Sequence, residues 1–287
     1  FKAAGEALSF NTSKIDLSDG ADLSIDSTGG AITIAGIAGT SAELVTITAG
    51  ADNTTTETVS IGDVGDSNHA EIHNLTITAD DGITLTGAIY TAEDGSAATV
   101  TFNDKVIVDG TVVIDTDDAG TTHDGAIVFT TSIDGPSDGG TNTLTIDSGV
   151  GAITLQPIGA NNALTTLNIN TGSTSTVALS VPNIGAGIIS TTTGTGVTGV
   201  TTIGNSNADS VVFSGTIYKT GGAFNVTTEA GSNTTDTEIS FTGANPFIAT
   251  SGDAVALNGG EILLGNGANL TIDSNITNAT IGGAISF

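Results

Sequence analysis

The chain has 287 residues, and its 31 acidic side chains against four lysines and no arginine give a formal net charge of −27. This balance argues against a nucleic-acid or anionic-membrane partner, because both are bound through lysine and arginine side chains that displace counterions. Cysteine is absent, so disulfides do not stabilise the fold. No apolar run approaches the roughly 20 residues that a membrane helix needs, and membrane insertion is therefore not expected.

The rest of the composition favours an ordered protein outside the cell. Hydrophobic residues make up 38% of the chain and alternate with polar ones, so disorder is the weaker interpretation despite the high charge. A pI near 4.1 and an abundance of threonine, asparagine and aspartate favour an extracellular, cell-surface location. The chain begins at Phe1 without a signal-peptide pattern, which indicates a processed chain or a segment of a longer one.

Short stretches of alternating apolar and polar residues, separated by glycine-rich or polar turns, occur throughout the first half of the chain. Such alternation predicts β-strands, because successive side chains of a strand point to opposite faces. Asn-Asp and Asp-Gly pairs divide residues 99–115 into three strands. The other segments that carry expected strands in this half are residues 7–10, 14–17, 23–26, 29–36, 44–48, 59–62, 70–78, 80–87 and 126–135.

Residues 141–170 show the repeated unit most clearly, as a strand of about four residues, a glycine corner and another strand. Leu144 and Ile146 point to one side of their strand, while Thr145 and Asp147 point to the other. The same alternation returns twice within the unit, and no helical period fits it. In the second half the scheme continues at residues 177–180, 199–205, 210–218, 223–227, 238–243, 254–265 and 270–273.

Small branched side chains inside, glycine or asparagine at the corners and threonine outside are the requirements of a stacked coil. We therefore predict an all-β fold, a right-handed parallel β-helix (β-solenoid) with about 20 residues per coil. No linker or composition shift divides residues 1–287, so one continuous unit is expected. The alternative is a set of tandem antiparallel β-sandwich modules, although the tryptophan and cysteine anchors common in such modules are absent.

Two runs of the sequence resemble a known family. TFNDKVIVDGTVVIDTDDAGTTHDGAIVFTTSIDG (101–135) and NTLTIDSGVGAITLQPIGANNALTTLNIN (142–170) are similar to the β-strand repeats of giant secreted bacterial adhesins, the filamentous-haemagglutinin-like surface proteins. The resemblance implies a right-handed parallel β-helix that is exported to the cell surface and acts as a stalk, fibre or adhesin. An Arg-Gly-Asp motif is absent, so the resemblance supports the structural role more than the adhesive one.

The segment HAEIH contains a candidate metal site. His69, Glu71 and His73 alternate, so on a strand all three side chains would project from one face. Two imidazoles and a carboxylate suit Zn²⁺ or another divalent transition metal. The alternative is an ordinary solvated strand face.

The segment DTDDAG contains a candidate Ca²⁺ site. Asp115, Asp117 and Asp118 could supply carboxylate oxygens, with Asp80 and Asp81 as a further pair. The spacing matches neither an EF-hand loop nor the Gly-Gly-x-Gly-x-Asp nonapeptide, and the density of acids alone predicts weak, diffuse Ca²⁺ binding. No other cofactor and no catalytic residue is expected.

Parallel β-helices also host polysaccharide-cleaving sites, which provide the enzymatic alternative. Such sites usually need basic residues to steady an acidic sugar or a carbanion, and four scattered lysines do not supply them. A neutral-sugar hydrolase that uses two carboxylates stays open as an alternative. Ice binding by threonine ladders is another, and it requires a regular coil spacing that the irregular turn lengths do not suggest.

These observations predict a non-enzymatic extracellular structural protein, a stalk or filament subunit on a bacterial surface. Unpaired strand edges template further strands, and no polar cap is evident at Phe1 or Phe287, so self-association end to end into a fibre is expected. The binding alternative is an adhesin for a glycan or a host-cell surface. An exposed aromatic platform would favour adhesion, and Tyr90 and Tyr218 are the only tyrosines.

Overall fold

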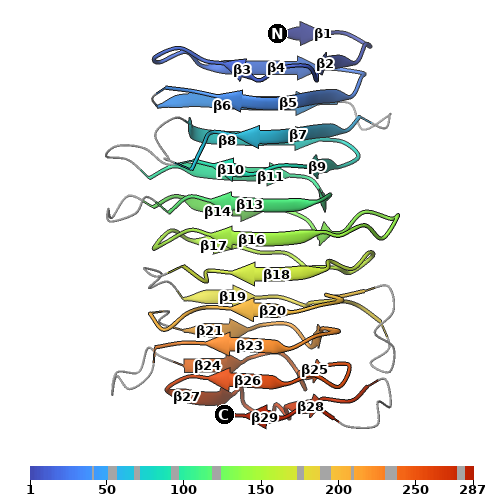
Figure 1. Cartoon of the computed structure of the whole chain (residues 1–287), viewed down its shortest axis with the longest axis vertical. Helices are drawn as coiled ribbons and strands as arrows, with labels where there is room; N and C mark the ends of the chain where they lie inside the picture. Colours follow the sequence, from blue (N-terminus) through green and yellow to red (C-terminus); the bar gives the residue numbers. More distant parts are fainter. Residues whose placement is uncertain are drawn as a thin grey trace.

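The computed structural model describes residues 1–40, 42–50, 57–67, 72–91, 97–117, 124–172, 178–187, 195–207, 210–229, 238–276 and 282–287. These residues form 29 β-strands and no helix, so the predicted all-β fold is confirmed. Within the same ranges, nothing forms a helix long and apolar enough to cross a membrane. The strands are stacked one above another along a single axis from the N-terminus to the C-terminus (Figure 1).

Every strand pairing that the structure describes is parallel. Strands that follow one another in the chain do not pair with each other, and each pairs instead with strands one coil away. This arrangement arises when the chain winds around one axis. The structure is therefore a parallel β-solenoid, and the alternative of antiparallel β-sandwich modules was wrong.

Each coil passes three walls, which we name A, B and C in the order in which the chain visits them. Wall A contains β1 (Lys2–Ala3), β4 (Leu23–Ser27), β6 (Glu43–Ala49), β8 (Ile72–Ala79), β11 (Thr99–Asn103), β14 (Ala126–Phe129), β17 (Ile153–Thr154), β19 (Leu179–Val181), β21 (Val211–Phe213), β24 (Glu238–Phe241) and β27 (Glu261–Leu264). Wall B contains β2 (Leu8–Phe10), β5 (Ile32–Ala38), β7 (Val59–Val64), β9 (Ile83–Leu85), β12 (Val106–Val108), β15 (Ile133–Asp134), β22 (Ile217–Lys219), β25 (Phe247–Ala249) and β28 (Thr271–Asp273). Wall C contains β3 (Ile15–Asp16), β10 (Ile89–Tyr90), β13 (Thr111–Asp115), β16 (Thr143–Asp147), β18 (Thr166–Ile169), β20 (Thr201–Ile203), β23 (Phe224–Thr227), β26 (Val255–Asn258) and β29 (Ile285–Ser286), together with the ends of β5 and β7.

The coils differ in length. Leu23 pairs with Val45, 22 residues further on, whereas Leu167 pairs with Thr201, 34 residues further on. The prediction of about 20 residues per coil was therefore too short. Each coil contains three walls and the segments that join them, so the strands account for only part of its residues.

Two ladders of inward-pointing side chains run through the coils without interruption. The wall-B ladder consists of Leu8, Ile32, Val59, Ile83, Val106, Ile133, Ile158, Ile184, Tyr218, Ile248 and Ile272. The wall-C ladder consists of Ile15, Ile37, Val64, Ile89, Ile114, Ile146, Ile169, Ile203, Val226 and Leu257. Members between the two ends are buried, and burying each such side chain contributes about 1.5–3 kcal/mol. The core is thus one long column made mainly of aliphatic residues.

The corner between walls C and A explains several of the glycines and asparagines in the sequence. Directly after the wall-C ladder position, Gly65, Asn170 and Gly204 have φ angles of 67°, 47° and 71°. Only glycine, and to a lesser degree asparagine, adopts this left-handed backbone at low cost. The predicted use of glycine and asparagine at corners is confirmed at this position.

Candidate functional site

A group of aspartates at the corner between walls C and A contains two of the predicted Ca²⁺ ligands. β13 and β16 pair in register, so Asp115 lies beside Asp147 of the neighbouring coil. Both follow a buried isoleucine of the wall-C ladder and therefore point outward. Asp117 and Asp124 lie on either side of residues 118–123. We call these four residues the acidic corner.

Backbone N–H groups donate to both of the stacked aspartates. The N–H of Asp117 donates to Asp115 Oδ1 at 3.0 Å, and the N–H of Gly149 donates to Asp147 Oδ1 at 3.2 Å. Such bonds favour the charged form of a carboxylate. One oxygen of each aspartate thus fixes the local turn of the chain.

Gly149 allows neighbouring carboxylates to approach the backbone of the turn at the acidic corner. Its φ of 53° is left-handed, and a side chain at this position would collide with the carboxylates of Asp117 and Asp124. Asp124 is buried, and its Oδ2 accepts a hydrogen bond from the N–H of Val150 at 2.6 Å. The carboxylates of Asp117 and Asp124 therefore lie against a turn that only glycine fits.

Asp147 has the most perturbed carboxyl group of the acidic corner. Burial, with a smaller contribution from the charges of Asp115 and Asp117, raises its pKa to about 6 against the opposing effect of the N–H groups of Gly149 and Gly172. Asp147 therefore takes up a proton in mildly acidic solution, where an ordinary exposed aspartate stays charged. Like charges lie close together at the acidic corner, and protonation or a bound cation would reduce the repulsion between them.

Only some of the predicted metal ligands lie among the described residues. Asp118, His69 and Glu71 lie outside the described residues, while His73 is half-buried on β8 of wall A. Within the described ranges, no three histidine, aspartate or glutamate side chains are grouped so that they could hold a metal ion. The Zn²⁺ and Ca²⁺ sites both stay predictions.

Sequence reasoning missed Asp124 and Asp147 as members of the acidic corner. A signal for Asp147 was present, since TVVID (111–115) and TLTID (143–147) share one pattern and pair residue for residue. Nothing in the sequence marks Asp124, because its approach depends on the path of the chain between two strands. Stacked like charges are therefore found by aligning strands, whereas contacts across a corner are not.

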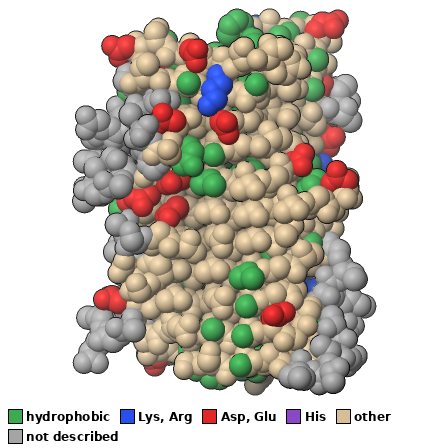
Figure 2. Space-filling view, viewed as in Figure 1, with side chains coloured by type: hydrophobic (Ala, Val, Ile, Leu, Met, Phe, Trp, Pro, Cys, Tyr) green, Lys and Arg blue, Asp and Glu red, His purple; other side chains and the backbone are tan. Residues whose placement is uncertain are grey.

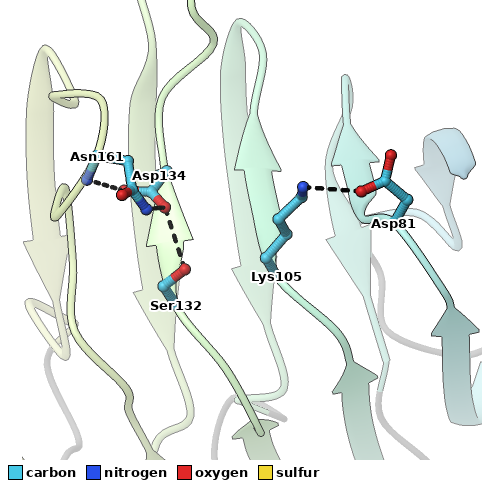
Figure 3. A network of polar contacts seen from close by, with 5 residues as sticks. All are labelled: Asp81, Lys105, Ser132, Asp134 and Asn161. Carbon is cyan, nitrogen blue, oxygen red and sulfur yellow. Dashed lines mark hydrogen bonds and ion pairs between the residues drawn. The ribbon is translucent and has the colours of Figure 1, made fainter. Parts of the chain in front are cut away.

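Two further aspartates show how differently a carboxylate can be placed in this fold (Figure 3). Asp81 forms an ion pair with Lys105 at 3.2 Å, and both side chains are nearly half exposed. Asp134 is buried, and it accepts hydrogen bonds from Ser132 Oγ at 3.1 Å and from Asn161 N–H and Nδ2 at 2.8 and 2.9 Å. Asp134 ties one coil to the next, whereas the surface pair contributes little.

Two residues that could have served a binding or catalytic site are buried instead. Lys219 is buried, and its Nζ donates to Ala186 O at 3.2 Å and to Thr195 Oγ1 at 2.9 Å, while burial lowers its pKa. Tyr218 is fully buried and packs edge-on against Phe213 at 4.8 Å. The aromatic platform that would favour glycan binding therefore does not include Tyr218.

The outward side chains of the walls are mostly uncharged. On wall A, Thr46, Thr76 and Thr101 stack in register, and Val128 follows them on the next coil. Figure 2 shows one broad face of the molecule, on which uncharged side chains and backbone cover most of the surface and acidic side chains gather toward one edge near the middle. The threonine ladder that ice binding would need is thus interrupted after three coils on this wall.

No known protein family, no curated protein and no solved structure matches the chain. The function proposed below is therefore argued from the fold and the surface of the chain.

Proposed function

We propose that the chain is a non-enzymatic structural protein of a bacterial cell surface, where it forms part of an extracellular stalk or filament. The observation that supports this best is the pair of uninterrupted ladders, from Leu8 to Ile272 and from Ile15 to Leu257. In a solenoid the strand hydrogen bonds lie along the axis and the core extends with them. A column of this kind resists extension along its length, as a stalk must.

The distribution of charge supports growth along the axis over growth at the sides. With a formal net charge of −27, two columns that approach side by side repel each other. The walls offer mainly threonine, serine and asparagine, which remain well hydrated. In a solenoid, unpaired strand edges occur only at the ends of the column, so growth along the axis is the route that remains.

Electron microscopy of the purified chain tests this function directly. Negatively stained particles and light scattering are compared over a hundredfold range of protein concentration, at low and at high salt. We expect rods that lengthen with concentration, more readily at high salt, while their width stays that of one column. Rods that keep the length of one chain under all of these conditions would contradict the proposal.

A further inference from the structure

A hollow of about 240 Å³ opens on the surface between walls B and C, far from both ends of the column. Three successive coils contribute to it, which gives it sides as well as a floor. The lining consists of Pro136, Ser137, Gly139, Gly140, Asn142, Asn162, Ala163, Thr165 and Thr198. We call this space the B–C hollow.

The B–C hollow lies where the connection from wall B to wall C becomes longer. Two residues, Asp109 and Gly110, join β12 to β13, whereas residues 135–142 join β15 to β16. The longer connection forms a loop that projects from the column beside the start of β16 (Figure 1). The loop provides one side of the hollow, and the next two coils provide the rest.

Hydrogen bonds attach this loop to the next coil at its two ends. The N–H of Gly135 donates to Asn162 O at 3.0 Å, and the N–H of Thr165 donates to Asn142 O at 2.8 Å. Among the described residues, no backbone hydrogen bond connects residues 136–141 with the next coil. The loop therefore bridges residues 162–165 and leaves a space between its two attachments.

Side-chain hydrogen bonds hold the floor of the B–C hollow in place. Asn142 is buried, and its N–H and Nδ2 donate to Thr165 Oγ1 at 3.1 Å and to Ala163 O at 3.3 Å. Thr165 Oγ1 in turn donates to Asn142 Oδ1 at 2.9 Å. A ligand that binds here does not have to order these groups, and this reduces the entropic cost of binding.

Two side chains of the lining keep their hydrogen-bonding capacity. The amide of the half-buried Asn162 and the hydroxyl of the exposed Ser137 form no hydrogen bond with another described residue. The amide carries a donor and an acceptor side by side in one plane, and the hydroxyl can act as either. Pro136 and Ala163 add small apolar surfaces next to these polar groups.

Charge and size limit the kind of ligand that fits. The lining contains no charged residue, although the chain has a formal net charge of −27, so an anion would be repelled and a cation would find no ionic partner in the lining. Pockets for drug-sized apolar ligands measure about 300–1,000 Å³ and are lined mainly by hydrophobic and aromatic side chains. The B–C hollow is smaller and more polar, which suits one compact, neutral, hydroxyl-rich ring.

We infer that the B–C hollow binds a neutral sugar residue. The Asn162 amide binds two neighbouring hydroxyl groups of the sugar, Ser137 binds a third, and Pro136 and Ala163 contact its C–H groups. No aromatic ring is part of the lining, so the binding is weak, with a dissociation constant on the order of 1–10 mM for a single ring. This binding function is additional to the proposed structural one and does not depend on assembly of the chain.

Nuclear magnetic resonance of the ¹⁵N-labelled full chain tests the site. The methyl glycosides of glucose, galactose, mannose and N-acetylglucosamine are titrated separately. We expect at least one of them to cause saturable shifts of the backbone N–H signals of Gly139 and Gly140 and of the Asn162 amide signals. Methyl glucuronide should bind more weakly than methyl glucoside, because its carboxylate approaches a negatively charged chain.

Substitutions in the same part of the chain show whether the lining binds the sugar. Asn162→Ala should weaken binding about tenfold or more, because two hydrogen bonds are lost, and Ser137→Ala should weaken it about threefold. Neither side chain is bonded to another described residue, so both variants should keep the fold. Thr141→Ala is the matched control, since Thr141 is exposed in the same loop but lies outside the lining.

The outcomes decide the inference in either direction. Saturable shifts around the B–C hollow that Asn162→Ala removes and Thr141→Ala leaves unchanged support it. It is overturned if none of the four glycosides causes saturable shifts, or if the shifts lie elsewhere in the chain. Equal affinity of Asn162→Ala, Ser137→Ala and the unchanged chain would also overturn it, because the sugar would then not be bound by these side chains.

Discussion

The N-terminal and C-terminal halves of the solenoid have the same three walls but fill them differently. In the N-terminal half, wall A stacks Ile25, Ile47 and Ile77, and the aromatic rings of Phe102 and Phe129 then stack at 5.0 Å. In the C-terminal half, aromatic residues form a larger cluster. Its central ring, Phe213, lies 4.8 Å from Tyr218, 4.9 Å from Phe241 and 5.9 Å from Phe224.

The course of the coils differs between the two halves as well. In the C-terminal half an additional short ladder, Leu164, Val197 and Thr220, runs between walls B and C. Wall B itself is reduced to isolated bridges at Ile158 and Ile184 before β22 begins. The aromatic cluster begins in the coil where this extra ladder ends, at Thr220, whereas the coils of Leu164 and Val197 keep aliphatic ladder members.

Replacing Phe213 should have the largest effect on stability. Phe213→Ala is expected to lower the free energy of unfolding by about 3–5 kcal/mol, because it removes the ring that three others contact. Phe102→Ala is the comparison in the N-terminal half, where the ring stacks on Phe129, and it should cost less. Urea unfolding followed by circular dichroism measures both. Equal losses would mean that the two halves do not differ in their dependence on aromatic packing.

Asp134 lies where the paired strands of wall B end, and its removal should have the next largest effect. β15 pairs with β12 on one side, and on the other side only bridges such as the one between Ile133 and Ile158 continue the wall. Asp134→Ala removes the buried carboxylate that accepts two hydrogen bonds from the exposed Asn161, and the loss of these charge-assisted bonds should cost about 1.5–3 kcal/mol.

The matched control is Asp81→Ala, which breaks a half-exposed ion pair in the N-terminal half and should cost less than about 0.5 kcal/mol. Urea unfolding of the two variants and the unchanged chain gives both values. A loss at Asp81 as large as that at Asp134 would show that the hydrogen bonds donated to Asp134 do not compensate for the missing strand.

The parallel stacking of the strands could be predicted from the alternation of aliphatic and polar residues, as at Ile146 and Ile169, which indeed share one ladder. The course of each coil could not. Gly36 was interpreted as the end of a strand, yet it lies inside β5, where the strand bends from wall B into wall C. A side chain there would meet the carbonyl oxygen of Asp63, so this glycine serves a close approach between coils.

The candidate site was predictable to a similar extent. Asp115 and Asp117 were proposed as oxygen donors of one short acidic segment, and they do lie at one corner. Asp147 joins them because a later coil brings its strand into register, and Asp124 joins them because the chain turns back toward Gly149. Both events depend on coil length, which alternation does not encode. Local pattern therefore predicts what a residue faces, and not which coil lies next to it.

The smallest effect concerns the acidic corner, which lies where the two halves meet. Asp147→Asn removes a carboxyl group whose pKa is raised to about 6 in the folded protein. A group with a raised pKa binds its proton more tightly when folded, so it lowers stability as the pH rises from about 4 to above 6. At pH 8 the substitution should therefore stabilise the protein by about 1 kcal/mol, a value reduced to allow for partial exposure to solvent.

At pH 4 the same substitution should have only a small effect, because the carboxyl group is then protonated in the folded state and about half protonated in the unfolded state. Asp109→Asn, at an exposed position in the turn between β12 and β13, is the matched control, because it removes one carboxyl group without changing the acidic corner. Thermal unfolding at pH 4, 6 and 8 measures both variants. An equal gain in stability at all three pH values would mean that burial does not raise the proton affinity of Asp147. The stacked aspartates would then not destabilise the junction between the two halves.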